Sequence, residues 1–118
     1  MEEPIVSRLR EHWEDLLREG QGLGFKAGQV IAYEGHDPYG LFVILEGKVK
    51  FSKAGISCQE GHLWRAPKGM VVGLEPFFRQ TPFCCTCTAG EDCRVTFISK
   101  TQLLPFKELH EKNAANKE

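Results

Sequence analysis

The sequence lacks several features that whole classes of protein require. Its 118 residues hold 15 lysines and arginines against 16 aspartates and glutamates, so it has no basic excess of the kind that nucleic-acid binding rewards. No apolar run approaches the roughly 20 residues that a membrane-spanning helix needs. No basic segment followed by a long apolar stretch opens the chain as a signal peptide would. We therefore expect no direct DNA binding, no membrane insertion and a cytoplasmic location.

Catalytic motifs are also absent from the sequence. It contains no Gly-x-Ser-x-Gly, no P-loop and no His-Glu-x-x-His. Its four histidines do not gather in one motif, although the turn with His36, Asp37 and Tyr39 offers groups that bind ligands. A double-stranded β metalloenzyme needs histidines and a carboxylate inside its barrel, whereas the expected strands are apolar. We therefore expect a protein that is not an enzyme and that holds no metal.

The first stretch predicts a helix over residues 4–19. Apolar residues recur every three or four positions on one face: Ile5, Leu9, Trp13 and Leu16 or Leu17. Pro4 suits the first turn of a helix, and Gly20 and Gly22 end it. The helix is expected to pack on the body of the domain, and a partner-binding or dimer-forming helix is the alternative.

Residues 23–99 predict a body made of short strands. Twelve glycines and six prolines indicate many turns, and turn signals about every ten residues are typical of a sandwich or jelly roll. The expected strands cover residues 30–33, 41–45, 49–51, 71–72 and 95–98. The run from Leu41 to Leu45 is uninterrupted and apolar, which predicts burial on both faces.

The last stretch predicts a short helix over residues 105–113. Pro105 can open it, and Phe106 and Leu109 would then point inward. Together the three stretches make one domain over residues 1–118, a size that supports a single core.

Two motifs in the β-rich stretch resemble the opening of a cyclic-nucleotide-binding domain. Residues 28–35 read GQVIAYEG and residues 40–49 read GLFVILEGKV, while residues 91–100 resemble the last strand of that domain. The resemblance covers roughly residues 25–113. It implies the fold of the cyclic-AMP receptor/FNR-type sensors, a mainly β jelly-roll β-roll, or double-stranded β-helix, flanked by an N-terminal and a short C-terminal helix.

The resemblance also implies a function. We expect a stand-alone regulatory or sensor module, without a helix-turn-helix domain, in which ligand occupancy shifts the terminal helices. Such a module acts through a protein partner, whose identity the sequence does not reveal, or as a homodimer. A purely structural interaction module with a plugged pocket is the alternative.

The family binds its ligand in a phosphate-binding cassette with the pattern Gly-Glu-Leu, then a short gap, then Arg-Ser-Ala. By resemblance, the Glu holds the ribose hydroxyl, and the Arg with helix N–H groups holds the cyclic phosphate. The matching stretch here keeps the glycine as Gly73. It has Leu74 at the Glu position and Phe83 at the Arg position, and Cys84 and Cys85 replace Ser and Ala.

These replacements degrade the cassette. Each lost charge-assisted partner commonly costs about 1.5–3 kcal/mol, so cyclic-nucleotide binding is expected to be lost or altered. Glu75, one residue late, and Arg79, on the short helix, are the nearest substitutes. Two alternatives remain. Either a more apolar ligand occupies the site, or apolar side chains fill it, namely Leu74, Phe77, Phe78 and Phe83.

The five cysteines form the second group of interest. An odd number without a secretion signal fits reduced thiols. If residues 84–88 form a strand, Cys85 and Cys87 share one face and Cys84 takes the other, an arrangement unlike the turn of a zinc knuckle. Burial as small apolar side chains is the simplest interpretation. A redox or metal site at these three thiols is the alternative.

Overall fold

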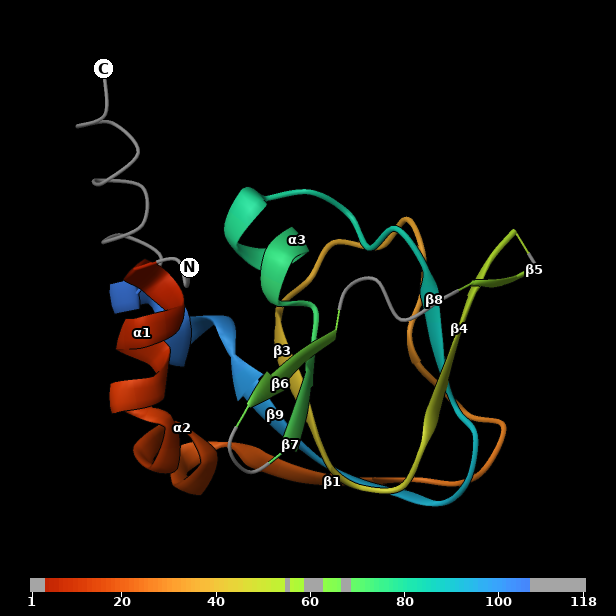
Figure 1. Cartoon of the computed structure of the whole chain (residues 1–118), viewed down its shortest axis with the longest axis horizontal. Helices are drawn as coiled ribbons and strands as arrows, with labels where there is room; N and C mark the ends of the chain where they lie inside the picture. Colours follow the sequence, from red (N-terminus) through yellow and green to blue (C-terminus); the bar gives the residue numbers. More distant parts are fainter. Residues whose placement is uncertain (1–3, 55, 59–62, 67–68, 107–118) are drawn as a thin grey trace.

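The computed structural model describes residues 4–54, 56–58, 63–66 and 69–106. Two short helices, α1 (Pro4–Glu11) and α2 (Trp13–Glu19), open the chain (Figure 1). The remaining elements follow in this order: β1 (Gln21–Phe25), β2 (Val30–Ala32), β3 (Gly40–Glu46), β4 (Val49–Lys53), β5 (Ile56–Cys58), β6 (Leu63–Ala66), β7 (Gly69–Val72), α3 (Leu74–Arg79), β8 (Thr86–Ala89) and β9 (Cys93–Ser99). A further helix covers residues 100–106.

The strands form two antiparallel sheets. The five-stranded sheet has the order β1-β9-β3-β7-β6, and the four-stranded sheet has the order β2-β8-β4-β5. Figure 1 shows the four-stranded sheet on one side of the five-stranded sheet, with α1, α2 and the helix over 100–106 on the other. The expected mainly β roll with flanking helices is confirmed.

Strand β3 lies at the centre of the five-stranded sheet and is buried on both faces, as predicted. Leu41 and Val43 are fully buried in a cluster with residues of all four helical segments, which we call the outer cluster. Ile44 and, partly, Phe42 pack into a second cluster between the two sheets, the inner cluster. The alternation of a strand thus divides one apolar run between two cores.

The N-terminal helix is divided at one residue. His12 has φ −110° and ψ 12°, so α1 and α2 are separate segments rather than the single helix predicted over 4–19. Leu9, Trp13 and Leu16 are nevertheless all buried in the outer cluster, as the spacing predicted.

The C-terminal helix begins earlier than predicted. It starts at residue 100, because Ser99 and Gln102 cap it: the Gln102 N–H donates to Ser99 Oγ (3.4 Å) and the Ser99 N–H donates to Gln102 Oε1 (3.2 Å). Pro105 therefore lies inside the helix and does not open it. Phe106 packs against the outer cluster as expected, whereas Leu109 and the end of the expected helix lie outside the described residues.

Strand β1 was missed because its sequence, QGLGF, resembles a helix stop. It pairs with β9 in a continuous register from Gln21↔Phe97 to Phe25↔Cys93. Hydrogen bonding to the backbone of β9 therefore holds β1 extended, because its glycines by themselves do not favour a strand.

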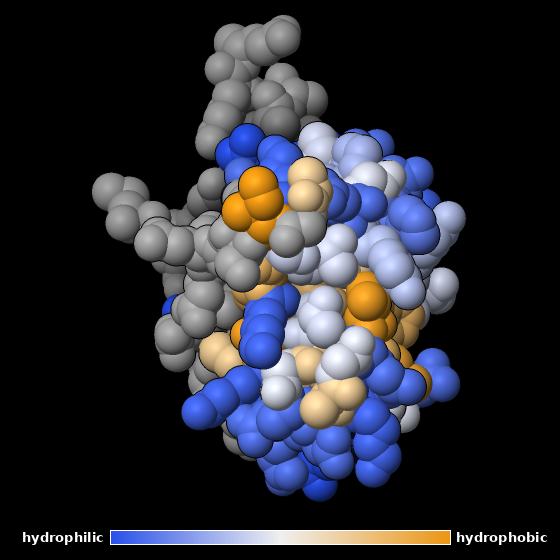
Figure 2. Space-filling model, turned by 90° about the vertical axis from the view of Figure 1, so that its right-hand side faces the viewer, coloured by the Kyte–Doolittle hydropathy of each residue, from blue (hydrophilic) through white to orange (hydrophobic). Residues whose placement is uncertain are grey.

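The described helices and one face of the surface can be characterised by their polarity. None of the described helices has the length and apolar character needed to span a bilayer. On the side of the molecule that carries β4 and β5, hydrophilic residues predominate and hydrophobic ones lie in small separate groups (Figure 2).

Candidate functional site

The cassette-like stretch runs from the end of β7 through α3 to the start of β8. Gly73 caps α3 with φ 95° and ψ 10°, a left-handed conformation that glycine adopts without steric cost. Its lack of a side chain matters as well, because a Cβ at this position would lie 3.0 Å from Cε1 of Phe83. Glycine therefore suits this position for two reasons: the turn has a left-handed conformation, and a side chain here would crowd the Phe83 ring.

Helix α3 packs its apolar side into the outer cluster. Phe77 and Phe78 are 2% and 6% exposed, with their rings 5.2 Å apart and nearly perpendicular. Leu74 is half-buried against the same cluster. One of the two alternatives had these three side chains fill the ligand pocket together with Phe83; instead they pack beneath the terminal helices.

Phe83, which the resemblance predicted to stand at the family's arginine position, lies in the inner cluster with 9% of its surface exposed. Its backbone is held at both polar groups: its N–H donates to the His36 carbonyl (3.0 Å), and its carbonyl accepts from the Gly35 N–H (2.8 Å). The ring lies close to Gly73, because a Cβ added to that glycine would be 3.0 Å from Phe83 Cε1. An apolar ring therefore lies beside the glycine turn of the cassette.

Glu75 and Arg79, the two predicted substitutes for the cassette's charged groups, pair with each other. Arg79 Nε lies 3.2 Å from Glu75 Oε1, one helical turn apart, and the two side chains are 65% and 50% exposed. An exposed pair of this spacing stabilises a helix by only a few tenths of a kcal/mol. The pair is thus weak enough to open, but in this structure each charge is already compensated on the surface of α3.

The cysteines of the cassette precede strand β8 and do not alternate along it. Cys84 is exposed and Cys85 is half-buried, and their Sγ atoms lie 3.8 Å apart. Cys87, inside β8, is buried in the inner cluster. Burial, with Cys93 nearby, raises the pKa of the Cys87 thiol to about 12. The predicted common face for Cys85 and Cys87 depended on a strand over 84–88, and the strand begins only at Thr86.

A cavity of about 210 Å³ lies beside Phe83 at one end of the roll. Its inner wall is apolar and includes Phe42 and Phe97, whose ring centroids are 5.0 Å apart. Polar groups of the lining come from the turn with His36, Asp37 and Tyr39, which the sequence identified as a candidate binding turn. Its lining consists of Ile31, Ala32, Tyr33, His36, Asp37, Tyr39, Phe42, Phe83 and Phe97.

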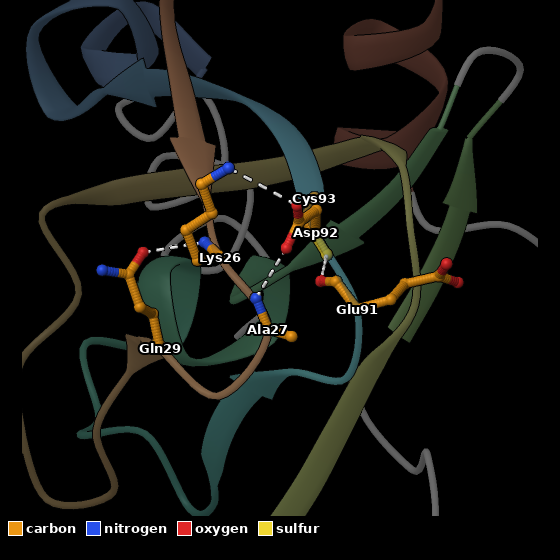
Figure 3. A network of polar contacts seen from close by, with 6 residues as sticks. All are labelled: Lys26, Ala27, Gln29, Glu91, Asp92 and Cys93. Carbon is orange, nitrogen blue, oxygen red and sulfur yellow. Dashed lines mark hydrogen bonds and ion pairs between the residues drawn. The ribbon is translucent and has the colours of Figure 1, made fainter.

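At another corner of the roll a charged network ties the β1–β2 turn to the start of β9 (Figure 3). Asp92 accepts from the Ala27 N–H (3.0 Å) and lies 3.5 Å from Lys26 Nζ. The Ala27 N–H first, and the Lys26 ammonium second, hold the pKa of Asp92 below its ordinary value. This network fastens a turn and contains no residue of the cassette-like stretch.

The two-sheet roll, with a helix-containing segment between β7 and β8, defines the class of β-roll domains. The sequence model of the family described as "Cyclic nucleotide-binding domain" matches residues 23–110. The chain belongs to this family, and its fold is that of a regulatory domain. No curated protein sequence matches the chain.

Solved structures with the same fold include three regulatory proteins. The regulatory domain of Toxoplasma gondii PKA with cAMP has a TM-score of 0.66 at 14% identity, covering 96% of this chain and 46% of that one. The sensor domain of the transcriptional regulator DNR from Pseudomonas aeruginosa gives 0.63 at 14%, covering 95% and 80%. Thermus thermophilus catabolite activator protein gives 0.62 at 20%, covering 98% and 57%. This chain thus spans about half the length of the first and third.

Proposed function

We propose that this chain is a non-enzymatic regulatory module in which the family's usual cyclic-nucleotide binding is lost or altered. The observation that carries the proposal is the position of Phe83. By resemblance, this position supplies the guanidinium that holds a cyclic phosphate, and here it supplies a ring buried between Gly73 and the inner cluster. A ring cannot neutralise a phosphate, and it occupies space next to the turn that would receive one.

Two further features support a changed cassette. Leu74 stands where a carboxylate would accept from the ribose, and its side chain packs against the outer cluster. Glu75 and Arg79 are compensated by each other on the surface of α3. Recruiting either of them to a ligand would separate this pair.

The outer cluster offers a route by which a change at α3 reaches the terminal helices. Phe77 and Phe78 of α3 share this cluster with Trp13 of α2 and Leu103 of the last helix. The last helix is also tied to α2, because Gln102 Nε2 donates to the Leu16 carbonyl (3.5 Å). If α3 has two positions, a ligand or partner that binds one of them more tightly would shift the population toward that position and move the terminal helices with it. A protein partner or a second copy of the chain would sense that shift.

Isothermal titration calorimetry with cAMP and cGMP tests the proposal. We expect no binding at micromolar concentrations to the unmodified chain, and measurable binding to the Leu74→Glu/Phe83→Arg double variant, which restores both groups of the family pattern. Glu75→Gln is the matched control, since it removes a carboxylate one residue from the restored one. Micromolar binding by the unmodified chain that Glu75→Gln or Arg79→Gln abolishes would refute the proposal.

A more apolar ligand is the second candidate, and the cavity beside Phe83 favours it. Five aromatic rings line this space, together with His36 and one carboxylate, that of Asp37. Fragment screening by ligand-observed NMR tests this candidate, and we expect the fragments not to bind the Phe83→Arg variant, which places a charge in the cavity lining.

A further inference from the structure

The sulfur atoms of two consecutive cysteines lie side by side in this protein. Cys84 and Cys85 have their Sγ atoms 3.8 Å apart, and Cys84 is exposed to solvent while Cys85 is half-buried. In an extended strand consecutive side chains would point to opposite faces. The bend that precedes β8 brings them to the same side instead.

The backbone on each side of this pair is held in place. On one side Phe83 is bonded to Gly35 and His36. On the other side Thr86 Oγ1 accepts from the Glu34 N–H (3.0 Å). The chain that carries the two thiols is therefore held on both sides before any ligand arrives, which lowers the entropy lost on binding.

The buried cysteines differ from this pair in reactivity. Only a thiolate is a good nucleophile or metal ligand, and burial raises the pKa of Cys87 to about 12. Burial also raises the pKa of Cys93, whose thiol contacts the carbonyls of Glu91 (3.2 Å) and Lys48 (3.3 Å). Figure 3 shows the Cys93 sulfur directed at the Glu91 carbonyl. Both thiols stay protonated and covered near neutral pH.

The spacing of Cys84 and Cys85 favours chelation over a disulfide. A disulfide needs sulfurs about 2.05 Å apart and Cα atoms at least about 4.4 Å apart, but consecutive Cα atoms are about 3.8 Å apart across a trans peptide. A centre that binds both thiolates needs no bond between the two sulfurs, only that they lie in contact with each other. The observed separation of 3.8 Å is such a contact.

We propose that Cys84 and Cys85 form a dithiol site for a thiophilic metalloid of the trivalent arsenic type. Soft thiolates select soft centres. Within the described part of the chain no three His, Cys, Asp or Glu side chains gather as a metal site, whereas a structural zinc ion needs four protein ligands. Trivalent arsenic is satisfied by two thiolates and one external substituent. The site does not depend on the proposed function, because it requires only the two thiols.

Phenylarsine oxide is the probe for this site. In the reaction two As–S bonds form and the As–O bond breaks. The oxygen leaves as water with the two thiol protons, and arsenic keeps its oxidation state. We expect one arsenical per chain in the intact mass, loss of two accessible thiols in a native thiol titration, and reversal by a small dithiol but not by an equal concentration of a monothiol.

Serine variants locate the site, all made in a Cys58→Ser background because the side chain of Cys58 lies outside the described residues. We expect Cys84→Ser and Cys85→Ser each to weaken binding at least tenfold, while the matched control Cys87→Ser binds as before. Peptide mapping of the adduct on the unmodified chain checks the same point without relying on the fold of a variant. An adduct that maps elsewhere, an undiminished affinity in Cys84→Ser, or a zinc complex that excludes the arsenical would each overturn the proposal.

Discussion

The contact between Phe83 and Gly73 makes a quantitative prediction, because a double-mutant cycle can separate its two components. Gly73→Ala forces a side chain into the left-handed conformation at φ 95°, which costs about 1–2 kcal/mol. It also places a Cβ 3.0 Å from Phe83 Cε1 and 3.4 Å from Cζ, and overpacking of this kind costs a further 1–3 kcal/mol or so. We expect Gly73→Ala to lower the free energy of unfolding by about 2–5 kcal/mol in total.

Phe83→Leu removes the ring atoms that meet this Cβ and keeps an apolar side chain in the inner cluster. In that background Gly73→Ala should cost only the conformational part, about 1–2 kcal/mol. The coupling between the two positions is therefore expected to be about 1–3 kcal/mol, within the range for residues in contact. Urea denaturation followed by circular dichroism measures all four proteins of the cycle.

Gly28→Ala is the matched control for this cycle. Gly28 has φ 91° and no atom within 4 Å of a Cβ placed on it, so its substitution carries the conformational cost alone and should be additive with Phe83→Leu. If Gly73→Ala costs the same in both backgrounds within about 0.5 kcal/mol, the ring does not press on the cassette glycine. Phe83 then does not crowd the glycine turn of the cassette-like stretch.

Two other predictions concern the frame of the domain. Because the folded state lowers the pKa of Asp92 below its ordinary value of 3.8, this carboxylate stabilises the fold fully above about pH 4 and less as the pH falls through the lowered pKa. Asp92→Asn should lower the urea midpoint at pH 7 and flatten its decline between pH 4 and 2, and an unchanged decline would contradict this. Leu103 is fully buried in the outer cluster, so Leu103→Ala should cost about 2–5 kcal/mol in urea denaturation. A loss below about 1 kcal/mol, the range of exposed sites, would mean that the last helix is not docked.

Much of the fold could be predicted because its signals are local. The apolar run from Leu41 to Leu45 predicted a strand buried on both faces, and the structure confirms it. Glycine turns and apolar strands in the family's order predicted the roll, and the family match confirms the assignment. The capping residues Ser99 and Gln102 were also present as a local signal, and they identify the true start of the last helix better than Pro105 does.

Other features depend on contacts between distant segments. Strand β1 has two glycines and becomes a strand only through pairing with β9. Phe77 and Phe83 are both apolar residues of the cassette-like stretch, yet one packs in the outer cluster and the other in the inner cluster. The rotation of α3 and the path of the chain after Gln80 decide this division, and neither has a sequence pattern of its own.

The sequence alone therefore determined the family and the roll, and it predicted the loss of the cassette's charged groups, because these follow from residue types and their order. Only the tertiary structure decided how the residues of the cassette-like stretch pack. It placed the Phe83 ring against Gly73, paired Glu75 with Arg79 on the surface, and brought the sulfurs of Cys84 and Cys85 together. Each of these depends on the direction of a side chain, which the packing of the surrounding chain sets and the order of residues does not.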